Sequence, residues 1–176
     1  MENSSKSIAV TYGIYLALLL SSVTILAYVI NLEWLTSMGV GIGLFIVILI
    51  FGIISIVKTK KLSQGFISFK EAFTAYFKTV VIGVLISSVV SIILFNYIDP
   101  DAADFLQEQV IIKTTKMMEN FGTPQEAIDK AIADIRNQNQ FDLLNQAKSL
   151  AMQLVFYAVI GLIIAFILKK NDPEAN

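Results

Sequence analysis

The sequence contains no cysteine and no histidine. Without thiols the chain can form no disulfide and has no cysteine nucleophile, and without imidazole it lacks the usual side chain for acid–base chemistry near neutral pH. Zinc sites built from Cys and His, and haem held through His, are therefore excluded. We expect no catalytic, cofactor-binding or metal-binding residues, and a protein that is not an enzyme.

Charged residues are scarce as well: they make up 15% of the 176 residues, and their formal net charge is −1. This balance gives no electrostatic reason to expect nucleic acid as a partner. Hydrophobic residues reach 56%, and the mean hydropathy is +0.71. Soluble domains are about 45–50% apolar, so the composition predicts a membrane protein with the lipid bilayer as its partner.

Long apolar runs, nearly free of charge, recur along the chain. Each is long enough to cross a hydrocarbon core about 30 Å thick. They predict a single membrane domain, residues 1–176, with spans at about 8–30, 35–57, 72–98 and 150–168. The predicted fold class is an all-α integral membrane protein with four transmembrane helices.

The segment between the third and fourth spans, 99–149, is polar but patterned. Apolar residues recur at helical spacing on both sides of Gly122, which is a natural helix stop. The first stripe contains Leu106, Val110, Thr114, Met117 and Phe121, and the second contains Ala127, Ile128, Ala131, Ile132 and Ile135. We expect an amphipathic helical hairpin whose stripes bury against each other, the bundle, the membrane or a partner.

The distribution of lysines predicts the orientation. Bases near the spans gather at the two termini and in the loop after the second span, whereas acids outnumber bases in 99–149. Short loops rich in Lys and Arg stay on the cytoplasmic side. Both termini should therefore be cytoplasmic and the hairpin extracytoplasmic. The basic residues on the inner side are Lys6, Lys58, Lys60, Lys61, Lys70, Lys78, Lys169 and Lys170.

The loop from Lys58 to Lys78 also contains a helix start. Ser68 and Glu71 have the spacing of a capping box. Aromatic residues then recur every three or four positions, which is typical of a helix in the headgroup region; they are Phe66, Phe69, Phe73, Tyr76 and Phe77. The candidate interfacial and topology residues are Lys58, Lys60, Lys61, Ser68, Phe69, Lys70, Glu71 and Phe73. The lysines either set topology alone or also contact anionic lipid.

Small residues mark candidate helix contacts. Gly39 and Gly43 form a Gly-x-x-x-Gly pair, which permits close backbone approach. We expect this pair to pack against the first span, with homodimerisation as the alternative. On the third span, a ridge of small residues should be the contact face, with a hydroxyl-lined pathway as the alternative; its members are Ala75, Thr79, Gly83, Ser87 and Ser91.

The segment Gly65-x-x-Ser68-Phe69-Lys70-Glu71-Ala72-Phe73 resembles the start of a span in the bacterial membrane proteins grouped as domain of unknown function 4199. The four-span layout and the helical insert before the last span are also similar to that family. The resemblance implies a bacterial inner (cytoplasmic) membrane location. It implies no catalytic residues and no mechanism.

Two functions remain open on the sequence. The first is a non-enzymatic structural, accessory or regulatory envelope component, which has a membrane-protein partner or forms a homo-oligomer. The alternative is a small oligomeric transporter or channel. Intramembrane charges usually mark ion and proton paths, and the span cores contain no Asp, Glu or Arg. This pattern favours the accessory function.

Overall fold

The computed structural model describes residues 2–137 and 142–170, with side chains from residue 7 onward. Within these ranges the structure is all-helical, with six α-helices and the short helical turns η1 (Leu32–Thr36) and η2 (Leu94–Ile98). The α-helices are α1 (Glu2–Ile30), α2 (Met38–Leu62), α3 (Phe69–Ile93), α4 (Pro100–Asn120), α5 (Gln125–Asn137) and α6 (Leu143–Leu168).

Four helical stretches are long and apolar enough to cross a membrane, which confirms the predicted number of spans. They are Ser7–Ile30, Met38–Leu62, Phe69–Ile98 and Leu143–Leu168. The last stretch extends from the apolar run 150–168 back to Leu143, where the side chain of Asp142 accepts a hydrogen bond from the amide of Leu144 and caps α6. Such capping satisfies an amide that has no partner within its own helix.

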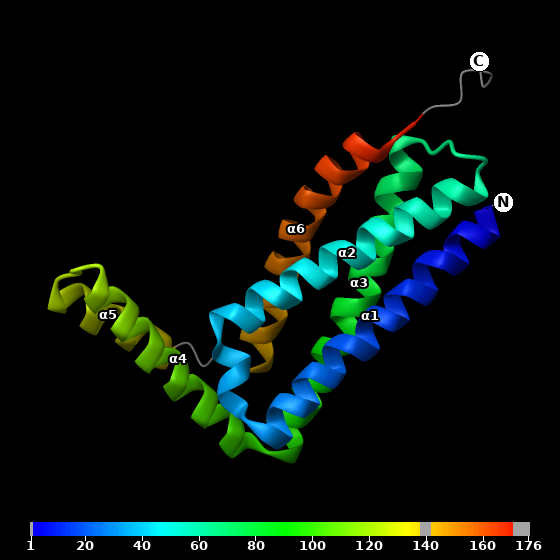
Figure 1. Ribbon diagram of the computed structural model, residues 1–176. Coiled ribbons are helices and arrows are strands. Elements are labelled where there is room, and N and C mark those ends of the chain that lie inside the picture. The colour runs from blue at the N-terminus through cyan, green and yellow to red at the C-terminus, as the bar shows by residue number, and fades with distance from the viewer. Residues whose placement is uncertain (1, 138–141, 171–176) are drawn as a thin grey trace.

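The helix α3 is central and contacts α1, α2 and α6 (Figure 1). Small residues allow α1 to approach it closely, because a Cβ placed on Gly83 would lie only 2.5 Å from Cδ2 of Leu16. The hydroxyl of Thr79 donates to the carbonyl oxygen of Ala9 across the same contact, at 3.1 Å. Close backbone approach of this kind gives dense packing between apolar helices.

At one end of the bundle, the loop before α3 is joined to the residues after α6. The backbone of Ile67 exchanges two hydrogen bonds with that of Lys170, at 2.8 and 2.9 Å. The ammonium of Lys60 donates to the carbonyl of Leu168 at 2.9 Å, which satisfies an acceptor at the C-terminus of α6. We call this the closed end; α1 begins here and α6 finishes here (Figure 1).

At the opposite end, α4 crosses the bundle and extends past it (Figure 1). The phenol of Tyr28 donates to Oδ2 of Asp99 at 2.9 Å, while Oδ1 of the same carboxylate caps α4 by accepting from Ala102. Lys113 donates to the carbonyl of Glu33 at 3.2 Å. These contacts hold α4, from its start to Lys113, against the ends of α1 and η1. We call α4 and α5 together the arm.

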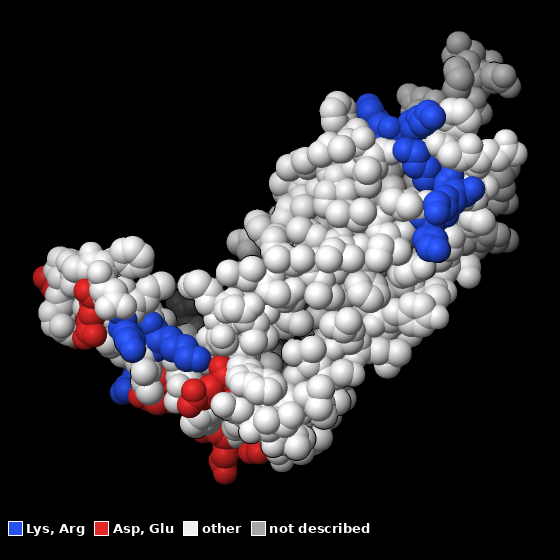
Figure 2. All heavy atoms as spheres, in the orientation of Figure 1, with Lys and Arg blue, Asp and Glu red and all other residues white. Residues whose placement is uncertain are grey.

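Charged side chains occupy the two ends of the molecule. On the face shown in Figure 2, basic residues gather at the closed end, and acidic residues gather with other bases at the arm. The zone between them on this face is free of charged side chains. An uncharged belt between two polar ends is what a membrane-spanning bundle requires.

Candidate functional site

A cavity of about 770 Å³ lies in the half of the bundle nearer the arm. Its walls come from α1, α2, α3 and α6, and Leu106 and Val110 of α4 cover its outer end. Pockets that bind small molecules typically enclose about 300–1,000 Å³ and are mostly apolar. The residues found in the lining include no charged side chain.

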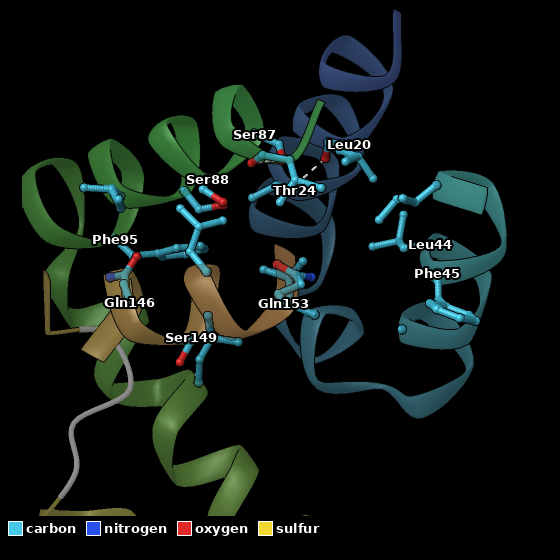
Figure 3. A pocket seen from close by; sticks show the side chains of 18 of the residues that line it. Leu20, Thr24, Leu44, Phe45, Ser87, Ser88, Phe95, Gln146, Ser149 and Gln153 are labelled. Carbon is cyan, nitrogen blue, oxygen red and sulfur yellow. Dashed lines mark hydrogen bonds between the residues drawn. The ribbon is translucent and has the colours of Figure 1, made fainter. Parts of the chain in front are cut away.

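Polar side chains line this space from the α3 side and from the α6 side (Figure 3). The α3 wall contributes Ser87, Ser88 and Ser91, and the α6 wall contributes Gln146 and Gln153. The hydroxyl of Ser87 donates to the carbonyl of Val84 at 3.0 Å. Its oxygen can still accept a hydrogen bond, so this wall offers acceptors to a ligand.

The cavity opens between α2 and α6. Gly41 on α2 and Gln153 on α6 are both exposed, and both belong to its lining. Its inner floor contains Ile48, Val84 and Tyr157. The ring of Phe45 stacks on that of Tyr157 with centroids 6.0 Å apart, so aromatic contacts separate the cavity from the core below it.

Below that floor, Tyr76 occupies the centre of the closed half, with 0% of its surface exposed. Its ring lies between two glycines, because a Cβ on Gly52 would overlap one edge and a Cβ on Gly161 would lie 2.5 Å from Cδ1. The ring therefore fits only where both α2 and α6 lack a side chain. We expected Tyr76 among interfacial aromatics; instead it is the largest fully buried side chain described.

The sequence does contain an indication of the contact between Tyr76 and the two glycines, although the aromatic spacing favoured another interpretation. Gly161 is the one glycine of its apolar run, and Gly52 lies nine residues beyond Gly43 in another. An isolated glycine in a helix is unfavourable by about 1 kcal/mol relative to alanine, so it often has a packing reason. Only the structure shows that the two glycines face the same ring.

The small-residue ridge of α3 divides into two parts. Ala75, Thr79 and Gly83 are buried in helix contacts. Ser87 and Ser91 instead line the cavity, where they are half-buried. The packing expected along the whole ridge is therefore found only in its first half, because α2 and α6 diverge from α3 beyond the floor of the cavity.

Gly39 and Gly43 do not pack against the first span. Both are exposed, and a Cβ on Gly43 would meet no atom within 4 Å. A Cβ on Gly39 would meet only the hydroxyl of Ser37, at 3.8 Å. The expected contact is absent because this turn of α2 lies at the mouth of the cavity, beside the exposed Gly41.

The predicted capping box at the start of α3 is present. The Ser68 hydroxyl accepts from the amide of Glu71 at 3.2 Å, and the Glu71 carboxylate accepts from the amide of Ser68 at 2.9 Å. Before it, the backbone of Gly65 has a φ of +92°, a conformation open to glycine at little cost. The capping box and the Gly65 conformation together allow the chain to reverse direction between α2 and α3.

The other residues of this motif have separate roles. Phe69 is partly exposed, whereas Phe73 stacks on Phe77 with centroids 5.4 Å apart and lies beside Gly161. Phe73 therefore packs within the bundle, one turn after the start of α3. Lys58, Lys61 and Lys70 are exposed at the closed end, while Lys60 is engaged with α6; Lys6 lies in α1, but its side chain is outside the described residues.

One of the acids near the start of α4 has a structural role. Asp99 caps the helix and accepts from Tyr28. Among the described residues, no group of three His, Cys, Asp or Glu side chains could hold a metal ion. The uncharged cavity is thus the principal candidate for binding.

Residues 11–170 match the family described as "Protein of unknown function (DUF4199)". The curated proteins and the solved structures contain no match to this chain.

Proposed function

The chain belongs to the DUF4199 family, and we propose that it is a non-enzymatic accessory protein of the bacterial inner membrane that binds a neutral, largely apolar ligand. The observation that supports this proposal is the cavity of about 770 Å³ with its uncharged lining. Burial of an ionised group without a partner is unfavourable, so the lining selects against charge on the part of a ligand that enters.

The chemistry of the walls favours a lipid chain as this ligand. Apolar side chains such as Leu44, Phe45 and Ile92 form much of the lining. The opening between α2 and α6 lies between two spans, where the hydrocarbon of a bilayer would be adjacent. An acyl chain from the leaflet could enter without crossing water, while a polar group on it hydrogen-bonds to the hydroxyl of Ser88.

In the orientation that we propose, the closed end and both termini face the cytoplasm. The lysines at the closed end support this orientation through the positive-inside rule. The arm would then be an extracytoplasmic hairpin. Its antiparallel course is supported by the 3.2 Å hydrogen bond from Gln107 to the carbonyl of Ile135. Lipid, a membrane-protein partner or a second copy of the chain are the partners that this placement allows.

A transporter or channel formed by a single chain is not favoured by this geometry. Leu16, Ile56, Tyr76 and Val80 are fully buried between the floor of the cavity and the closed end. A solute would have to displace this core to cross the membrane. The same half of the bundle contains no Asp, Glu, Lys or Arg among its buried described residues, which also argues against a proton relay.

Lipid retention tests the proposal. The protein would be purified from membranes of phosphatidylethanolamine and phosphatidylglycerol, and bound lipid would be counted by native mass spectrometry. Ser88→Phe places a ring in the cavity and should reduce retained lipid several-fold. The matched control is Ser22→Phe, because Ser22 is exposed on α1 and outside the lining. Equal retention by the two variants and the unmodified protein would exclude the cavity as the binding site.

A further inference from the structure

We propose that the arm lies on the surface of the bilayer, with one face of α4 in contact with lipid. This inference makes no use of the cavity as a binding site. Figure 1 shows α4 crossing the end of the bundle and continuing beyond it. The part of the helix beyond Lys113 therefore lies over whatever surrounds the spans at that level, which in a membrane is the headgroup region.

One apolar stripe of α4 runs from the bundle to the free part of the arm. Leu106, Val110, Met117 and Phe121 follow one another at four- and seven-residue steps, which keeps them on one side of a helix. Leu106 is 2% exposed against the bundle, and Val110 lines the cavity. Met117 is 44% exposed and Phe121 is 83% exposed. The stripe is continuous, but its protein partner ends where the bundle ends.

The direction of this stripe identifies what covers it. Leu106 and Val110 point from the end of the bundle into the space between the spans. A straight helix keeps that direction, so Met117 and Phe121 point towards the same membrane level but outside the bundle. Lipid is the surrounding medium there, and an apolar helix face in the headgroup boundary is stabilised in proportion to its buried area.

The sides of α4 away from the apolar stripe are either solvated or covered by α5. The exposed acids Asp101, Asp104, Glu108 and Glu119 lie on the side opposite the stripe, where water or headgroups can solvate them. A third side is covered by α5, whose Ile128 is 2% exposed and whose Arg136 lies 3.8 Å from Glu108. Within the described residues, neither α5 nor the bundle covers Phe121. The apolar Phe105 and Ile112 are also exposed, but they lie among the acids.

Two contacts fix the angle at which the arm leaves the bundle. Tyr28 holds the capping carboxylate of Asp99, and Lys113 reaches η1. Because these contacts lie about four turns apart along α4, they resist rotation of the helix about its own axis and away from the bundle. The apolar stripe is thereby kept facing the bilayer.

Tryptophan fluorescence tests this inference directly, because the chain has a single tryptophan. In a Trp34→Phe background, Phe121→Trp and Ile112→Trp would be compared in nanodiscs. The two positions are nine residues apart, which at about 100° per residue places them on opposite sides of α4. Both residues are well exposed, so neither substitution disturbs the core.

Brominated acyl chains should quench Phe121→Trp at least twofold more than Ile112→Trp, and aqueous iodide should show the reverse order. Equal quenching of the two variants by both agents would overturn the proposal. Shielding of Phe121→Trp from iodide without quenching by brominated lipid would mean that protein covers the stripe, which also overturns it. A shielding that disappears as the protein is diluted to one copy per nanodisc would identify a second copy as that cover.

Discussion

The two halves of the bundle use the same four spans but differ in how these helices meet. In the closed half, α2 and α6 converge on α3, with glycines admitting the Tyr76 ring and Lys60 joining α2 to the end of α6. In the half nearer the arm, the helices diverge around a cavity of about 770 Å³. The difference shows that close packing of the four helices in one half is compatible with a cavity between the same helices in the other half.

Each half also has its own means of closing its end. The closed end relies on backbone hydrogen bonds between Ile67 and Lys170 and on a charged donor, Lys60. The other end relies on α4, which lies across the bundle and contributes Leu106 to the cavity wall. Stability should therefore depend mainly on the closed half, and ligand binding on the hollow half.

Removing the ring of Tyr76 should cause the largest loss of folding free energy. Tyr76→Ala leaves a large void between three helices, and comparable substitutions cost about 3–5 kcal/mol of folding free energy. Tyr76→Phe should be nearly neutral, because the buried hydroxyl has no hydrogen-bond partner among the described residues. Unfolding by SDS titration, followed by circular dichroism, measures both. A large loss in Tyr76→Phe would mean that the hydroxyl has an essential partner.

Replacing a glycine of α2 by alanine should change the folding free energy less than removal of the Tyr76 ring does. The size of the change should depend on the half of the bundle in which the glycine lies. Gly52→Ala forces a methyl group against the Tyr76 ring and should destabilise by about 1–3 kcal/mol. Gly43→Ala is the control on the same helix, where the added Cβ meets nothing within 4 Å. It should be neutral or slightly stabilising, because alanine favours helix. Similar thermal stability of the two variants would remove the distinction between the halves.

Removing the hydrogen bond between Lys60 of α2 and the end of α6 should cause the smallest loss of folding free energy. Lys60→Met keeps the apolar stem but loses the hydrogen bond to the Leu168 carbonyl. Such a loss costs about 1 kcal/mol when the acceptor is partly solvated. Lys61→Met serves as the control, since Lys61 is exposed on the adjacent position. Chemical denaturation of the two variants would show whether the hydrogen bond matters; a larger loss for Lys61→Met would contradict the assignment.

The all-helical class and the number of spans could be predicted from the sequence, whereas the cavity could not. Apolar run length alone predicts the number of spans, and Ser68 with Glu71 predicts where α3 begins, because both signals are local. The cavity depends on where α2 and α6 diverge, which no local pattern encodes. For the same reason Ser87 and Ser91 could not be distinguished from Thr79 and Gly83 by spacing, although all belong to one ridge.

Tyr76 is a second case in which a local pattern did not predict the tertiary position of a side chain. Its spacing from Phe69 and Phe73 is that of an interfacial aromatic face, which is why we expected it at the headgroups. Its burial depends on Gly52 and Gly161, which are distant in sequence and on different helices. Pairing of this kind is a tertiary property, so a single sequence does not reveal it.

Thiol labelling tests the contrast between the halves most directly, because the chain has no cysteine of its own. Single variants Ala75→Cys and Ser91→Cys would lie on the same ridge of α3, the first in the closed half and the second in the cavity. In nanodiscs, the small neutral reagent methyl methanethiosulfonate should modify Ser91→Cys, while Ala75→Cys should react only after denaturation in SDS. Equal labelling rates for the two variants in the folded protein would contradict the division into a closed half and a hollow half.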